Sequence, residues 1–177
     1  VGLNLRRKGT LNRLRVQKQH LKWNSEALNP ILIKLIRIML NNRELEKIAS
    51  AIREAERFTS GEIRVYVARR CKGNPLVEAA KKFESLKMND TELHNGVLIY
   101  IAPHDRKAAI YGDSGIAKMA DEGFWNQALD DLLTSCRDGQ VVDGICKAIA
   151  KVGELIKKKY PALENDKNEL GDEVVEE

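Results

Sequence analysis

The feature that most constrains the fold is a run of six residues, Val97–Ala102, in which every side chain is apolar. A strand without a polar face is covered on both sides of its sheet, so this run predicts a central strand. Residues 62–68 alternate instead, with Ile63, Val65 and Val67 on one side. Such alternation is typical of a strand with one more exposed face. The two segments therefore predict a sheet with 97–102 near its middle.

A helical pattern separates these two strands. Asn74 and Pro75 have the residue types of a helix cap and a first helical position, and apolar residues follow at three- and four-residue spacing as far as Leu86. The order strand, helix, strand predicts a right-handed crossover between parallel strands. Residues 107–111 follow a short turn at 103–106 and predict an antiparallel neighbour. The sheet should therefore be mixed.

Three more helices are expected around this sheet. Asn41 and Glu44 have the spacing of a capping box, and the helix that they begin should end by Gly61. A second helix should begin after Asp121 and a third near residue 140, since apolar residues recur there at helical spacing. The expected class is α/β, an α/β/α sandwich around a small mixed β-sheet of three to four strands.

Charge divides the 177-residue chain into three parts. Residues 1–38 carry nine basic and one acidic residue, a net +8, whereas residues 162–177 carry seven acidic and one basic, a net −6. The part between them, 39–161, is the expected domain, and the acidic C-terminal tail is expected to be mobile. The basic extension is either an arm for phosphate or an anionic membrane surface, or sequence upstream of a natural start at Met39.

Composition excludes several classes of protein. Three cysteines, none in a C-x-x-C pair, do not make a disulfide scaffold or a zinc ribbon, and they suit a reducing compartment. The longest apolar stretches reach only about half the length of a membrane span, so no membrane span is expected. With 5% aromatic residues, a stacking platform for nucleic acid is not expected, and the basic arm is the only alternative route to nucleic acid.

The motif that looks most specific does not indicate the function it suggests. The segment Gly112–Gly115 (Gly-Asp-Ser-Gly) matches the nucleophile segment of chymotrypsin-like proteases, but Ile116 follows where glycine is required, and no histidine stands in a catalytic context. No phosphate-binding P-loop and no dinucleotide-binding motif is present. A loop at the end of a strand is the better interpretation of this segment.

Oxygen-bearing side chains cluster at one predicted edge of the sheet. Asn95 precedes the continuous apolar strand and Asp113 follows its antiparallel neighbour, so both should fall at the same edge; Asp121 and Glu122 open the next helix nearby. Carboxylates with an amide oxygen suit a hard cation, Ca²⁺ or Mg²⁺. The alternative is that Asp113 serves the turn and Asp121 only caps a helix.

With these elements in place, the chain from about Arg43 to Tyr160 resembles the TPM domain family. The likeness is carried by Glu56–Val67, by Asn95–Ile101, by Asp105 with Arg106, by Gly112 with Gly115 and Ile116, and by Asp121 ahead of Phe124 and Trp125. The ending Asn168–Glu173 (Asn-Glu-Leu-Gly-Asp-Glu) is similar to a cytoplasmic bacterial subset of the family without a membrane anchor.

The resemblance implies an α/β/α sandwich with a divalent-cation site in loops at one edge. Asn95 and Asp121 match family positions, whereas His94 stands where members commonly have Asp. We expect a cytoplasmic accessory module that binds Ca²⁺ or Mg²⁺ through Asp113, Asp121, Glu122 and Asn95.

Because plant members have been assigned phosphatase activity, the alternative is a metal-assisted, acid phosphatase-like phosphoesterase. In it Arg106 would pair with the phosphate and the cation would activate water. No nucleophile can be assigned, and the sequence leaves open whether the chain is an enzyme.

Overall fold

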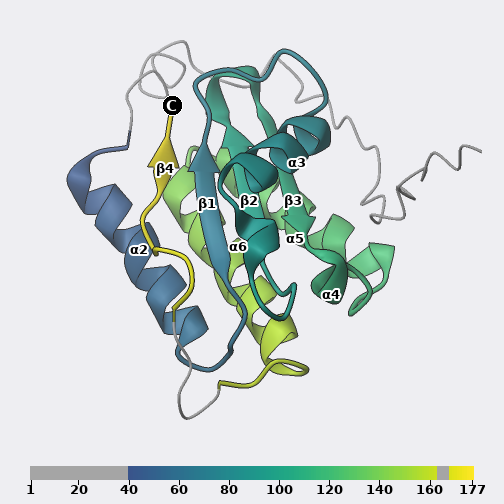
Figure 1. The fold of residues 1–177 in the computed structure, drawn as a ribbon. Helices are drawn as coiled ribbons and strands as arrows, with labels where there is room; N and C mark the ends of the chain where they lie inside the picture. The colour runs from purple at the N-terminus through teal and green to yellow at the C-terminus, as the bar shows by residue number, and fades with distance from the viewer. Residues whose placement is uncertain (1–39, 163–167) are drawn as a thin grey trace, which may run out of the picture.

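The computed structural model describes residues 40–162 and 168–177. Five helices and four strands make up this part of the chain, together with two short 3₁₀ turns (Figure 1). The helices are α2 (Asn42–Glu56), α3 (Pro75–Ser85), α4 (Ser114–Ala117), α5 (Glu122–Arg137) and α6 (Val141–Lys157); the strands are β1 (Ile63–Val67), β2 (Val97–Ala102), β3 (Lys107–Gly112) and β4 (Val175–Glu176).

The four strands form one mixed sheet in the order β3-β2-β1-β4. Strand β1 runs parallel to β2, with Ile63 opposite Val97, and β3 runs antiparallel to β2, with Gly112 also opposite Val97. β4 adds to the outer side of β1 in parallel. The predicted α/β sandwich with a mixed sheet of up to four strands is therefore confirmed.

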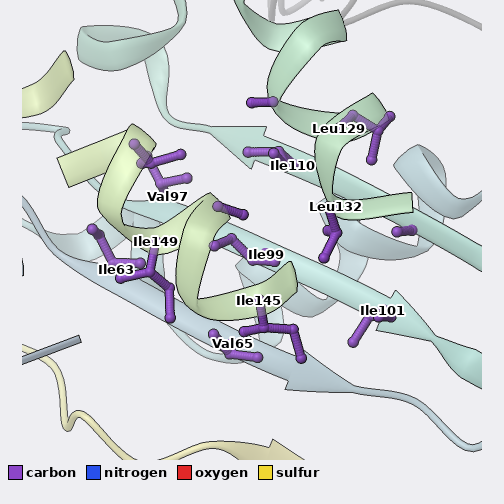
Figure 2. Packing of buried hydrophobic residues seen from close by; sticks show 14 of the residues in the cluster. Ile63, Val65, Val97, Ile99, Ile101, Ile110, Leu129, Leu132, Ile145 and Ile149 are labelled. Carbon is purple, nitrogen blue, oxygen red and sulfur yellow. The ribbon is translucent and has the colours of Figure 1, made fainter. Parts of the chain in front are cut away.

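Helices cover both faces of the sheet (Figure 1): α3 lies on one face, and α2, α5 and α6 lie on the other. Every residue of β2 is buried, because its alternate side chains enter the two cores. Val97, Ile99 and Ile101 pack with α5 and α6 residues such as Leu132 and Ile149 (Figure 2). The remaining β2 side chains enter the smaller core beneath α3. The continuous apolar run is thus explained by a two-sided burial.

The helix starts follow the predicted capping chemistry. The Asn41 side chain accepts hydrogen bonds from the backbone N–H groups of Arg43 and Glu44, and the Glu44 carboxylate accepts one from the Asn41 N–H, which completes a capping box. Asn74 caps α3 through the Leu76 N–H. Each such cap is worth about 1 kcal/mol, so these residues place the helix ends.

The described part of the acidic C-terminal tail contains a strand, which its composition does not predict. Residues 168–177, here called the C-terminal strap, lie along β1 and end in β4. Near the start of the strap the Glu62 carboxylate accepts hydrogen bonds from the backbone N–H groups of Glu169 and Leu170, at 2.9 and 3.3 Å. The strap pairs with the β1 edge, whose backbone groups would otherwise lack partners in the sheet, and the charge of this segment does not reveal that pairing.

Two further expectations concern the basic N-terminal segment and membrane spans. The basic segment 1–38 lies outside the described residues. Among residues 40–162 and 168–177, no helix is both long enough and apolar enough to cross a membrane.

Glu56, in the last turn of α2, is a largely buried acid beside the strap. One carboxyl oxygen accepts a hydrogen bond from the Ile63 N–H at 2.7 Å. Burial, together with the neighbouring carboxylates of Glu62 and Asp172, raises the pKa of Glu56 to about 9, against the lowering effect of the Ile63 N–H. Glu56 is therefore protonated at neutral pH and hydrogen-bonds to the Asp172 side chain.

Glu56→Gln should stabilise the protein, and the gain should grow with pH. In the wild type the folded state keeps a proton that the unfolded chain releases, so stability falls as pH rises from about 4.5 toward 9. Glutamine keeps an acceptor for the Ile63 N–H and a donor for Asp172 without that proton. Urea unfolding at pH 5 and pH 8 should show a gain on the order of 1 kcal/mol at pH 8 that shrinks at pH 5.

Glu54→Gln is the matched control, because Glu54 lies exposed on the same helix and pairs with Arg57. An equal pH dependence in the Glu54 and Glu56 variants would contradict a raised pKa at Glu56.

Candidate functional site

Two loops meet at the edge of the sheet where β2 begins and β3 ends. We call residues 91–96 the Asn95 loop and residues 112–116 the Asp113 loop. Backbone hydrogen bonds join them: the Asp113 N–H donates to the Gly96 carbonyl at 2.9 Å, and the Gly115 N–H donates to the His94 carbonyl at 3.0 Å. The antiparallel register of β2 and β3 thus brings Asn95 and Asp113 to one edge, as predicted from the sequence.

Asn95 is buried, with 1% of its surface exposed. Its side-chain N–H₂ group donates to the Ser60 carbonyl at 2.6 Å, while its Oδ1 is buried without a hydrogen-bond partner among the described residues. An unpaired buried amide oxygen costs about 1–3 kcal/mol, and such atoms are rare in native proteins. Oδ1 of Asn95 is therefore a buried acceptor that the described residues leave without a donor.

Asp113 brings a carboxylate to the same edge and is only 8% exposed. Its Oδ1 accepts a hydrogen bond from the Ser114 N–H at 2.6 Å and so caps α4. Its Oδ2 lies 3.2 Å from Nδ1 of His94, a residue with an exposed side chain and a left-handed backbone conformation (φ 51°). The pair joins a buried carboxylate to an imidazole that reaches solvent.

Asp121 and Glu122 lie further along the chain, at the start of α5, and both are exposed. The Asp121 carboxylate accepts a hydrogen bond from the Phe124 N–H at 2.9 Å, so this aspartate caps its helix as Asp113 caps α4. In the part of the chain that the structure describes, no three His, Cys, Asp or Glu side chains form a group that could hold a metal ion. The four predicted ligands therefore do not form a preformed metal site with three carboxylates.

Arg106, the predicted phosphate partner, lies at the other end of the β2–β3 hairpin. It follows the turn Pro103–Asp105, whereas Asp113 follows the last residue of β3. Six-residue strands with a rise of about 3.3 Å per residue separate the two ends by roughly 17–20 Å. Arg106 thus does not share a site with Asn95 and Asp113, a consequence of hairpin geometry that the motif alone does not show.

Sequence reasoning missed the residues that hold the two loops together. A Cβ at Gly115 would lie 2.6 Å from the His94 carbonyl oxygen and 3.0 Å from that of Leu93, so only glycine permits this approach. The Tyr160 hydroxyl donates to the Gly115 carbonyl at 3.4 Å. The Gly-Asp-Ser-Gly segment contains Gly115, but the sequence does not show that this glycine contacts the Asn95 loop.

The geometry agrees with what comparison with known proteins finds. The family model for the TPM domain matches residues 38–155. The chain belongs to the TPM domain family. No curated protein matches the chain.

Two solved structures share the architecture of this TPM domain. The NMR structure of the BA42 protein from the psychrophilic bacterium Bizionia argentinensis sp. nov. is 34% identical, with a TM-score of 0.74 over 80% of this chain and 98% of that one. The N-terminal domain of the cg2496 protein from Corynebacterium glutamicum is 13% identical, with a TM-score of 0.53 over 78% of this chain and 82% of that one. The second likeness concerns the fold alone.

Gly115→Ala should destabilise the protein by about 1–3 kcal/mol, because the added methyl group meets two backbone carbonyls that cannot rotate away. Urea unfolding monitored by circular dichroism measures the change. Gly73→Ala is the control, since a Cβ there has only the Glu78 carboxylate within contact range, at 3.9 Å. A Gly115 variant as stable as the control would contradict the close packing of the two loops.

Proposed function

We propose that this TPM domain binds a divalent cation, Ca²⁺ or Mg²⁺, between the Asn95 loop and the Asp113 loop, and serves as a cation-dependent binding module. The observation that carries the proposal is the buried Oδ1 of Asn95, which has no hydrogen-bond partner among the described residues. The negative charge of Asp113 at the same edge supports it.

The donor types fit a hard cation. Ca²⁺ takes six to eight oxygen ligands from carboxylates, amides, backbone carbonyls and water, whereas Mg²⁺ keeps several waters beside one or two carboxylates. Asn95 offers an amide oxygen and Asp113 a carboxylate, and water would complete the shell. Because residues 40–162 and 168–177 gather no group of three ionisable ligands, we expect weak binding, with a Kd of roughly 10⁻⁴–10⁻³ M.

Asp121 and Glu122 would contribute to this site mainly through charge. Both are exposed at the start of α5, and the Asp121 carboxylate already accepts the Phe124 N–H. A carboxylate oxygen can accept more than one interaction, so the cap does not prevent Asp121 from binding a cation or its water. Exposed acidic residues near a site also raise the local concentration of cations.

Asp113→Asn should lower Ca²⁺ affinity by about tenfold or more, equivalent to ~1.4 kcal/mol, with little change in stability. Asparagine is as good a helix cap as aspartate, so α4 keeps its start while the site loses its buried charge. Calorimetric titration of Ca²⁺ and Mg²⁺ into the full chain measures the affinity. Asp138→Asn is the control, because Asp138 is an exposed acid at the opposite end of α5 from Asp121.

An affinity that falls equally in the Asp113 and Asp138 variants would mean non-specific attraction, and a wild type without measurable binding would contradict the proposal.

His94→Asp should raise Ca²⁺ affinity. The resemblance to the family places an aspartate at this position, and a second carboxylate beside Asp113 would add a ligand. Asp and Asn both tolerate the left-handed backbone of His94, so His94→Asn is a control with the same shape and no charge. Tighter binding by the Asp variant than by the Asn variant is expected in the same titration. Equal affinities would show that position 94 lies away from the cation.

A metal-assisted phosphoesterase is the second candidate, and the His94–Asp113 pair favours it. A carboxylate that holds one imidazole nitrogen leaves the other directed at solvent, which is the arrangement of many general bases. Incubation with p-nitrophenyl phosphate at acid and neutral pH, with and without Mg²⁺, tests it. Turnover lost in His94→Asn and Asp121→Asn would support an enzyme, and turnover no higher than in a mock preparation would reject one.

Free cysteines support placement in a reducing compartment such as the cytoplasm. All three cysteines are unpaired, and Cys71 and Cys136 are buried in the cores. Burial raises the pKa of the Cys136 thiol to about 12, which keeps it protonated and unreactive.

A further inference from the structure

The C-terminal strap reaches the Asn95 loop through Glu169. The backbone N–H of Glu169 donates to the Glu62 carboxylate at 2.9 Å, and the Glu169 carboxylate accepts a long hydrogen bond from the Glu92 N–H, at 3.4 Å to each oxygen. Glu169 therefore lies between the entry to β1 and the first half of the Asn95 loop.

Glu62 links the strap to the sheet from the other side. Its side chain, in a residue only 5% exposed, accepts hydrogen bonds from two successive backbone N–H groups of the strap, those of Glu169 and Leu170. Its backbone carbonyl accepts a hydrogen bond from the Val97 N–H at 2.7 Å, directly after the Asn95 loop. Both carboxyl oxygens of Glu62 thus act as acceptors for the backbone of the strap.

The far end of the strap is held independently. The Glu177 side chain accepts a hydrogen bond from the Tyr66 hydroxyl at 2.8 Å and pairs with Lys82 of α3 at 3.1 Å. Leu170 and Val175 pack against the core beneath α3. The strap is thus fixed at both ends, and its contact with the Asn95 loop belongs to a defined structure.

The Asp113 loop holds one side of the Asn95 loop, where Gly115 packs against the Leu93 and His94 carbonyls. Glu92 and Leu93 are exposed, and the strap contacts this half of the loop at the Glu92 N–H. The side chain of Asn95 is held by its hydrogen bond to the Ser60 carbonyl. Residues that contact the ligands of a metal site, and not the ion, orient those ligands. Substituting such residues commonly changes the affinity of the site for the metal.

We propose that the C-terminal strap, through Glu169 held on Glu62, positions the Asn95 loop and so sets the cation affinity of the site. The inference rests on the proposed cation binding, and it gives a role to the Asn168–Glu173 segment that the fold of residues 40–162 does not explain. Glu169 acts here as a positioning residue.

A rival explanation is that the strap attracts cations only through its negative charge, and matched variants at position 169 separate the two. Glu169→Gln removes the charge but keeps an acceptor oxygen for the Glu92 N–H, whereas Glu169→Ala removes both. Glu173→Gln removes one charge from an exposed residue of the same strap. If Glu169 positions the loop, cation binding depends on its acceptor oxygen. If the strap only attracts cations, cation binding depends on its negative charge.

The test uses the full chain, with the same variants in two measurements. In NMR spectra without added cation, Glu169→Ala should shift the backbone amide resonances of residues 92–96, and Glu169→Gln and Glu173→Gln should leave them near their wild-type positions. In calorimetric titration with Ca²⁺, Glu169→Ala should weaken binding by roughly tenfold, and both glutamine variants should stay within about twofold.

Unshifted resonances of residues 92–96 in Glu169→Ala would overturn the positioning role. Equal loss of affinity in Glu169→Ala and Glu169→Gln would assign the effect to charge and also overturn it. If the wild type binds no Ca²⁺, the proposed function fails together with the effect on affinity, and the resonances alone then decide whether the strap positions the loop.

Discussion

Two-sided burial of β2 is the constraint on which the rest of the structure depends. Every side chain of this strand enters one of the two cores, so a slip in its register would move apolar residues into the wrong layer. The register in turn places Val97 opposite both Ile63 and Gly112. The loops just outside these residues therefore meet at one edge, and Asn95 comes to lie beside Asp113.

Buried polar groups that would destabilise an apolar core lie at this same edge of the sheet. Asn95 keeps one oxygen without a partner among the described residues, and Glu56 keeps a proton because burial and neighbouring carboxylates oppose its charge. The Glu62 carboxylate accepts hydrogen bonds from two backbone N–H groups of the strap. Unpaired or protonated polar groups of this kind reduce stability, and they gather where function is commonly found. The cation proposal and the role of the strap explain this edge together.

The pattern of residues predicted most of the fold, for identifiable reasons. The apolar run of β2 and the capping residues Asn41 and Asn74 act through local chemistry, so their consequences could be read from the chain, as could the meeting of Asn95 with Asp113. The strap could not, because β4 has two residues and no period, and because Glu62 binds backbone groups that any sequence supplies. The burial of Glu56 and the unpaired oxygen of Asn95 depend on such distant contacts.

An NMR titration that follows the backbone amides while Ca²⁺ is added tests the central claim most directly, because it locates the ion as well as detecting it. If the two loops form the site, the largest and saturable shifts will fall in residues 93–96 and 112–116, and the hairpin turn at 103–106 will stay unchanged. Shifts spread over exposed acidic residues, or centred on that turn, would show that the edge shared by Asn95 and Asp113 is not where a cation binds.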